Sequence, residues 1–187
     1  MAAESNMMPL GSEAPDFDLP DVVSGRNFTL DDVKGEYGLV VMFICAHCPY
    51  VKNIEEDLAA IVGQYANSKL GFVAISSNDV DAYPEDSPEG LKKQAKELDF
   101  TFPYLYDESQ EVAKAYQAAC TPDFYLFDED LKCVYRGRFD ASTPGNPEPV
   151  TGDSLIEAIE RHLEDEPAVD PQYPSIGCSI KWKTVSA

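Results

Sequence analysis

The pattern of apolar and polar positions along the chain predicts strands that alternate with helices. Residues 39–44 form an uninterrupted apolar run, which is typical of a central strand covered on both faces. After residue 48 the apolar positions recur every three or four residues, as in a helix with one buried face: Val51, Ile54, Leu58, Ile61, Val62 and Tyr65. A second buried strand is expected at residues 70–76 and a second helix at residues 88–98.

The second half of the chain predicts a hairpin and a last helix. A short extended segment at 102–106 and a short helix at 109–118 lead to an apolar strand at 124–127. A turn separates this strand from residues 133–137, its expected hairpin partner, and a last helix ends at Leu163. Strands that alternate with helices before a terminal hairpin predict an α/β fold, with a mixed central sheet and helices on both faces.

One domain with an extension at each end is expected. Residues 1–163 would form the domain and begin with a turn-rich N-terminal extension, whereas residues 164–187 form a proline-punctuated C-terminal tail. The tail carries the apolar residues Ile176, Ile180 and Trp182, which a disordered extension would not need. We therefore expect the tail to pack on the same domain.

Composition and charge narrow the expected environment and partners. The net charge is −20, from 34 acidic and 14 basic residues, and it repels nucleic acid and anionic lipid, so neither is expected as a partner. The longest apolar run is too short for a bilayer, and the first ten residues lack the apolar core of a signal peptide. Five cysteines, an odd number, do not resemble a disulfide framework. Reduced or catalytic thiols in a cytoplasmic protein are expected.

The sequence Cys45-Ala46-His47-Cys48 joins the apolar strand to the first helix. This placement puts Cys45 at the expected helix N-terminus, where free N–H groups favour a thiolate, and makes it the expected nucleophile. The two intervening residues bring Cys48 close enough to resolve a mixed disulfide. His47, if protonated, would lower the pKa of Cys45 further. The motif thus predicts a reversible dithiol/disulfide centre.

Metal binding is the alternative from another class of function. A structural zinc site would need a second cysteine pair at matching spacing, and the chain has none. A protein that binds or carries a soft ion such as Cu(I) would use Cys45 and Cys48. The dithiol interpretation requires neither a metal nor another cofactor.

Four segments resemble the thioredoxin-like superfamily, and more closely its peroxiredoxin-like branch, the alkyl hydroperoxide reductase/thiol-specific antioxidant group. They are residues 11–17, 43–51, 120–124 and 177–182. The resemblance implies a thioredoxin-like fold and a cis Pro122 beside the active cysteines. It also implies that the backbone of Thr121 binds a substrate strand by edge addition.

The chain departs from typical peroxiredoxins at two points. They have a threonine three residues before the reactive cysteine. When Cys48 is aligned on that cysteine, Cys45 stands in place of the threonine. They also have an arginine across the site, and residues 121–124 contain no arginine. A thiol-disulfide oxidoreductase with a Cys45/Cys48 couple is therefore the leading function. A thiol peroxidase that reduces hydroperoxides is the alternative. The expected partners are a protein disulfide or dithiol and a thiol reductant.

Two further cysteines are auxiliary candidates. Cys120 lies two residues before Pro122 and could approach the motif, but a small buried residue is the favoured interpretation. Cys178 could bring a third thiol to the redox centre. Packing is favoured here too, because a thiol flanked by apolar anchors needs no reactive role.

Overall fold

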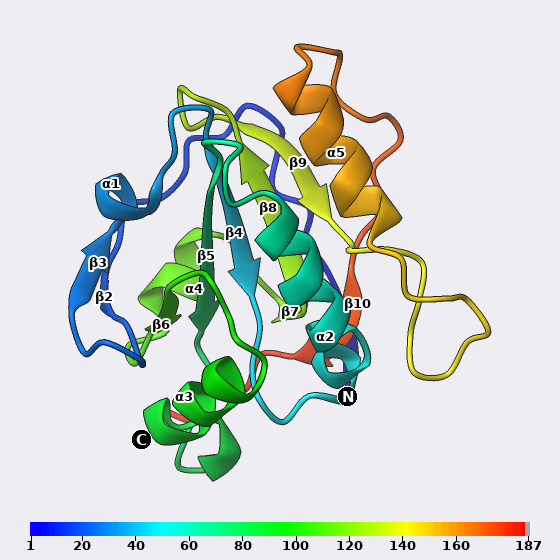
Figure 1. Cartoon of the computed structure of the whole chain (residues 1–187). Helices are drawn as coiled ribbons and strands as arrows, with labels where there is room; N and C mark the ends of the chain where they lie inside the picture. Colours follow the sequence, from blue (N-terminus) through cyan, green and yellow to red (C-terminus); the bar gives the residue numbers. More distant parts are fainter. Residues whose placement is uncertain (186–187) are drawn as a thin grey trace.

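Five strands form the central sheet of the computed structural model, which describes residues 1–185 (Figure 1). They are β4 (Leu39–Phe43), β5 (Gly71–Ser76), β6 (Tyr104–Tyr106), β8 (Asp123–Phe127) and β9 (Cys133–Gly137). The spatial order is β6-β5-β4-β8-β9; β4, β5 and β6 are parallel, whereas β8 and β9 run antiparallel to their neighbours. The expected mixed sheet and its terminal hairpin are confirmed.

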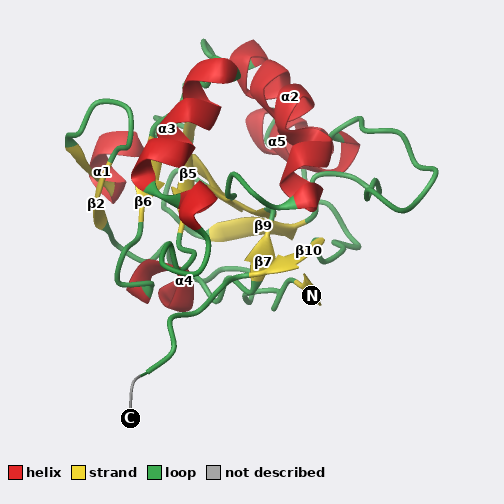
Figure 2. Ribbon diagram, turned by 90° about the horizontal axis from the view of Figure 1, so that it is seen from below, coloured by secondary structure: helices red, strands yellow, loops and turns green. Residues whose placement is uncertain are grey.

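Helices cover both faces of this sheet, as predicted. One face carries α2 (Pro49–Gln64), α3 (Pro88–Glu97) and α5 (Asp153–Leu163), and the other carries α1 (Leu30–Val33) and α4 (Glu111–Ala115). Figure 2 shows α2 and α5 side by side, with α4 on the opposite side of the strands. Alternate residues of β4 enter the two cores, Val40 on the α2 side and Val41 on the α4 side. All five residues of β4 are buried, which explains its continuous apolar sequence.

Two smaller sheets complete the fold. Strands β2 (Asp18–Pro20) and β3 (Asn27–Thr29) form an N-terminal hairpin. Three more strands, β1 (Ala2–Glu4), β10 (Ile176–Ser179) and β7 (Cys120–Thr121), form an antiparallel sheet that joins both ends of the chain to its centre. The sequence pattern predicts neither β1 nor a strand in the tail, because both are very short.

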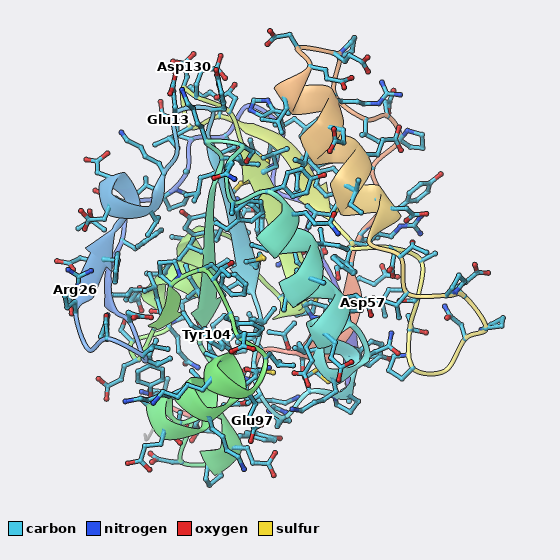
Figure 3. All side chains as sticks on the ribbon, in the orientation of Figure 1. Glu13, Arg26, Asp57, Glu97, Tyr104 and Asp130 are labelled. Carbon is cyan, nitrogen blue, oxygen red and sulfur yellow. The ribbon has the colours of Figure 1, made fainter. Side chains whose placement is uncertain are left out.

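The acidic side chains are spread around the molecule. Figure 3 labels Glu13 and Asp130 near each other at the top of the view, Asp57 on α2 and Glu97 near the bottom. Of the helices described, none combines the length and the apolar character that crossing a bilayer requires.

Candidate active site

The two cysteines of the motif lie in the connection between β4 and α2. Cys48 is the N-cap of α2, with extended backbone (φ −70°, ψ 126°), and Pro49 is the first helical residue. Proline is favoured there because its fixed φ suits the helix and its missing N–H would have no intrahelical acceptor. The expectation that Cys45 stands at the helix start is therefore wrong. Pro49 was the sequence signal that could have placed the helix correctly.

The surroundings of the two thiols separate their pKa values. Hydrogen bonding from Cys45 is the main cause that lowers the pKa of Cys48 to about 5. Burial opposes this shift, while Cys178 and the backbone N–H of Val51, in the first turn of α2, support it. The pKa of Cys45 is raised well above its usual value by its hydrogen bond to Cys48, by burial and by the Asp86 carboxylate. These surroundings favour the thiolate at Cys48 over the thiolate at Cys45.

Thr121 contacts both sulfurs. Its hydroxyl oxygen lies 3.4 Å from Cys45 Sγ, and its backbone carbonyl accepts a hydrogen bond from the neutral Cys48 thiol at 3.4 Å. The Thr121-Pro122 peptide is cis, as the family resemblance implied. Thr121 belongs to β7, and Cys178 of β10 stands directly opposite it. An edge of β7, the strand expected to receive a substrate, is thus already paired with the tail of the chain.

His47 binds a buried carboxylate, Asp86. Its Nδ1 pairs with Asp86 Oδ2, and its ring stacks on Tyr83 at a centroid distance of 4.7 Å. The Asp86 hydrogen bond raises the pKa of His47. Burial opposes ionisation of Asp86, but hydrogen bonds from His47 and Asn78 lower its pKa overall. The pair with Asp86 therefore favours the protonated form of His47.

Asp86 is the main site residue that sequence reasoning missed. Its Oδ1 also accepts hydrogen bonds from the backbone N–H groups of Ala46 (2.8 Å) and His47 (3.0 Å), so it shapes the motif loop itself. It lies in the short 3₁₀ helix Pro84–Asp86 between β5 and α3. No local signal distinguishes it among the 34 acidic residues of the chain.

A second buried network fixes the backbone of Cys45. Gln94 Nε2 donates hydrogen bonds to the Cys45 carbonyl at 3.0 Å and to Glu55 Oε2 at 2.8 Å. Gln94 Oε1 accepts a hydrogen bond from the Tyr104 hydroxyl at 2.9 Å. Tyr104, labelled in Figure 3, is fully buried in β6. Because every polar atom of Gln94 is bonded, this network holds the loop in one conformation.

The auxiliary candidates lie in different surroundings. Cys120 is buried with its Sγ directed at the carbonyls of Pro122 (3.8 Å) and Ser175 (3.9 Å), and burial raises its pKa far above the usual range. These are the surroundings of a packing residue. Cys178 is half-buried and lies beside Cys48. All five cysteines are free thiols in this structure.

A pocket next to Pro122 is lined by residues from α2, from the segment after β9 and from the tail, among them Tyr50 and Arg138. The Arg138 Nε donates to Ser154 Oγ at 3.1 Å, and its guanidinium lies over the Tyr173 ring at 4.5 Å. The Arg138 side chain is therefore already engaged by Ser154 and Tyr173.

Three possible metal donors lie together at the motif. Cys45 Sγ, a His47 ring nitrogen and an Asp86 oxygen are within 4.8 Å of one another. Mixed sulfur, nitrogen and oxygen donors suit Zn²⁺ better than Cu(I). Both Asp86 oxygens already accept hydrogen bonds, which a metal would have to displace. The donor set does not favour a Cu(I) carrier.

The profile of the AhpC/TSA family matches residues 10–136, a range that contains the whole Cys45–Cys48 loop and Thr121. The chain belongs to the AhpC/TSA family. Thiol-disulfide oxidoreductase ResA of Geobacillus kaustophilus is 29% identical over 163 residues, which cover 86% of this chain and 80% of that protein. A Mycobacterium tuberculosis protein whose name places it among the peroxiredoxins is 32% identical over 136 residues, covering 66% of this chain and 81% of that protein.

Solved structures agree with this family membership. An uncharacterized conserved protein from Geobacillus kaustophilus, known from a crystal structure, is 56% identical in sequence. The alignment covers 100% of this chain and 98% of that chain, with a TM-score of 0.97. A more distant thioredoxin domain, from a thiol-disulfide oxidoreductase of Bacteroides vulgatus, is 21% identical and shares the fold with a TM-score of 0.65. That alignment covers 83% of this chain and 99% of the other. The thioredoxin-like fold is confirmed, and this AhpC/TSA chain is a thiol redox enzyme.

Proposed function

We propose that this AhpC/TSA enzyme exchanges electrons with protein disulfides by cycling between a Cys45/Cys48 dithiol and a disulfide. The observation that carries the proposal is the contact of both sulfurs with Thr121, at 3.4 Å each, beside the cis Thr121-Pro122 peptide. The pKa of Cys48 is lowered in this arrangement and that of Cys45 is raised. A thiolate is the attacking species in disulfide exchange, and an adjacent thiol resolves the product. The directions of the two pKa shifts favour the reverse of the roles expected from sequence, with Cys48 as nucleophile and Cys45 as resolving thiol.

In the forward direction, Cys48 Sγ attacks one sulfur of a substrate disulfide. The substrate S–S bond breaks, a mixed disulfide forms, and the first substrate thiolate takes up a proton. Cys45 then loses its proton and attacks Cys48 Sγ, which releases the second substrate thiolate and leaves the enzyme oxidised by two electrons. The proton that Cys45 loses balances the proton that the first substrate thiolate takes up.

The proposed substrate is a protein dithiol or disulfide, and the proposed reductant is a thiol. A cytoplasmic location is proposed with them, because five free cysteines suit a reducing compartment. The net charge of −20 disfavours polyanionic partners.

Reduction of insulin by dithiothreitol, followed as turbidity, tests the proposal. We expect Cys48→Ser to abolish catalysis. Cys45→Ser/Cys178→Ser should abolish it while trapping a mixed disulfide at Cys48, because no neighbouring thiol is left to resolve it. Cys133→Ser is the matched control, since Cys133 is buried with its Sγ on the Tyr135 carbonyl at 3.4 Å. Full activity in Cys48→Ser would reject the assigned roles.

A thiol peroxidase is the second candidate, favoured by one observation: the Cys48 thiolate stands at the N-cap of a helix that opens with Pro49. In this reaction Cys48 Sγ breaks the O–O bond of a hydroperoxide and becomes a sulfenic acid, while the alkoxide is protonated. Cys45 then condenses with the sulfenic acid and releases water. Cys45 in place of the threonine and the restrained Arg138 weigh against fast peroxide reduction.

A further inference from the structure

Strand β10 occupies the position in which a substrate strand would bind. It pairs antiparallel with β7, so that Cys178 stands opposite Thr121 and Ser179 opposite Cys120. Its other edge pairs with β1, where Ala2 stands opposite Cys178. Backbone pairing on both sides fixes the register of Cys178 opposite Thr121. The Thr121 carbonyl is the group that accepts a hydrogen bond from the neutral Cys48 thiol.

Gly177 permits the close approach of these strands. A Cβ atom at this position would lie 2.0 Å from the Thr121 carbonyl oxygen, much closer than atoms can come. The approach sets Cys178 beside Cys48 and near the backbone N–H of Tyr50, at the start of α2. Cys178 thus holds the place of the substrate cysteine in a mixed disulfide.

Cys48 is the thiol that interacts with both of the others, Cys45 and Cys178. Among the described residues, the three sulfurs do not form a group in which all lie within 4.8 Å of one another. Cys45 and Cys48 both have 0% exposed surface, whereas Cys178 is half-buried. In this conformation Cys178 is therefore the most exposed of the three thiols.

We propose that Cys178 is a third redox thiol, which moves the disulfide from the buried Cys45–Cys48 pair to a Cys48–Cys178 bridge at the surface. This step rests on the proposed function. Cys178 Sγ, as a thiolate, attacks Cys48 Sγ, so that the Cys48–Cys178 bond forms and the Cys45–Cys48 bond breaks. The electron pair leaves on Cys45 Sγ, which takes up a proton. The exchange conserves electrons and needs no added oxidant.

The surroundings support both ends of this exchange. Burial, together with the hydrogen bond and charge of Cys48, raises the pKa of Cys178 to about 11. Oxidation of Cys48 removes that charge, so Cys178 ionises more readily once the first disulfide has formed. At the other end, a ring nitrogen of His47 lies within the 4.8 Å cluster of Cys45 Sγ, so the imidazole stands beside the thiolate that departs.

The new bridge also suits reduction from outside. An external thiolate that attacks Cys178 Sγ displaces Cys48, whose low pKa makes it a good leaving group. A second thiol then releases Cys178, and the enzyme regains both electrons. The partner implied by this geometry is a thiol reductant that never enters the buried site.

Oxidation of Cys45→Ser with one equivalent of diamide tests whether the second bridge forms. After an acid quench, alkylation and digestion, we expect peptides linked through Cys48 and Cys178 in most molecules. Cys45→Ser/Cys178→Ser should lose this bridge, and the control Cys45→Ser/Cys133→Ser should keep it. If Cys178 is found alkylated while Cys48 is oxidised or linked between chains, the proposal is overturned.

A second measurement separates the relay from the proposed function. Cys178→Ser should still form the Cys45–Cys48 bridge, but glutathione should reduce it at least ten-fold more slowly than it reduces the oxidised wild type. Equal rates would overturn the relay and leave the Cys45/Cys48 couple standing. Absence of the Cys45–Cys48 bridge in both proteins would instead count against the proposed function.

Discussion

The Nδ1 atom of His47 pairs with the Oδ2 atom of Asp86, a carboxylate 39 residues away whose side chain has 0% exposed surface. This pair lies under the motif loop, where Asp86 binds the backbone N–H groups of Ala46 and His47. The shape of the loop therefore depends on the protonation state of the His47–Asp86 pair.

The pair predicts a pH-dependent contribution to stability. The folded pKa of His47 is raised, so its contribution is complete below the unfolded value of about 6.5 and is lost as the pH rises through the folded pKa. The folded pKa of Asp86 is lowered, so its contribution is present above the unfolded value of about 3.9 and is lost as the pH falls through the folded pKa. The pair stabilises most between these limits.

Asp86→Asn tests this prediction. It should cost about 1–3 kcal/mol of unfolding free energy near pH 6, because buried donors lose a charged acceptor, and it should flatten the pH dependence around neutrality. Urea unfolding of the variant and the wild type at several pH values measures both effects. The His47 imidazole, assigned with His47→Gln, should titrate above about 6.5 by NMR in the wild type. A midpoint below that value would rule out the pair.

The reactive thiolate should belong to Cys48. Thiolate absorbance near 240 nm should rise with a midpoint at about pH 5 in the wild type and lose this phase in Cys48→Ser. Cys45→Ala should move the midpoint towards about 8.5, because the main hydrogen bond that favours the Cys48 thiolate is removed. Cys133→Ser should titrate as the wild type. A low-pH phase that survives in Cys48→Ser would return the nucleophile to Cys45.

Gly177→Ala should separate β10 from β7. The new methyl group would lie 2.0 Å from the Thr121 carbonyl oxygen, so the tail must shift and the Cys48 thiol should react several-fold faster with Ellman's reagent. Gly63→Ala is the matched control, because a Cβ there meets nothing within 4 Å and alanine stabilises a helix by about 0.5–1 kcal/mol. Unchanged Cys48 reactivity in Gly177→Ala would show that the tail does not cover the thiol.

Peroxide turnover should be slow. The site has no threonine hydroxyl at the position of Cys45, and Arg138 is bound to Ser154 and Tyr173. Fixed donors to the peroxide oxygens supply most of the stabilisation that such a reaction needs. Stopped-flow oxidation by hydrogen peroxide, with Cys48→Ser as the blank, measures the rate. Completion within milliseconds at micromolar peroxide would make the peroxidase the leading function.

The elements that depend on local sequence were predictable. The buried strand at 39–44 and the helix that follows it were visible because apolar spacing is a direct consequence of burial on two faces or on one. The family resemblance placed the cis Pro122 beside the motif. The helical pattern was read from residue 48 onward, as observed, but Cys45 was wrongly placed at the helix N-terminus, although the preference of proline for the first helical position was readable at Pro49.

The sequence by itself thus determined the α/β layering and the position of the two cysteines in one loop. Only the tertiary structure decided which cysteine becomes the thiolate, because a pKa depends on burial and on charges within a few ångströms, whatever their distance along the chain. Asp86 reaches the loop from the segment after β5, and Cys178 reaches it from the tail through the pairing of β10 with β7. Nothing in the local sequence marks Asp86 as a site residue. Cys178 was a candidate from the sequence, but only the pairing of β10 with β7 brings it to the site.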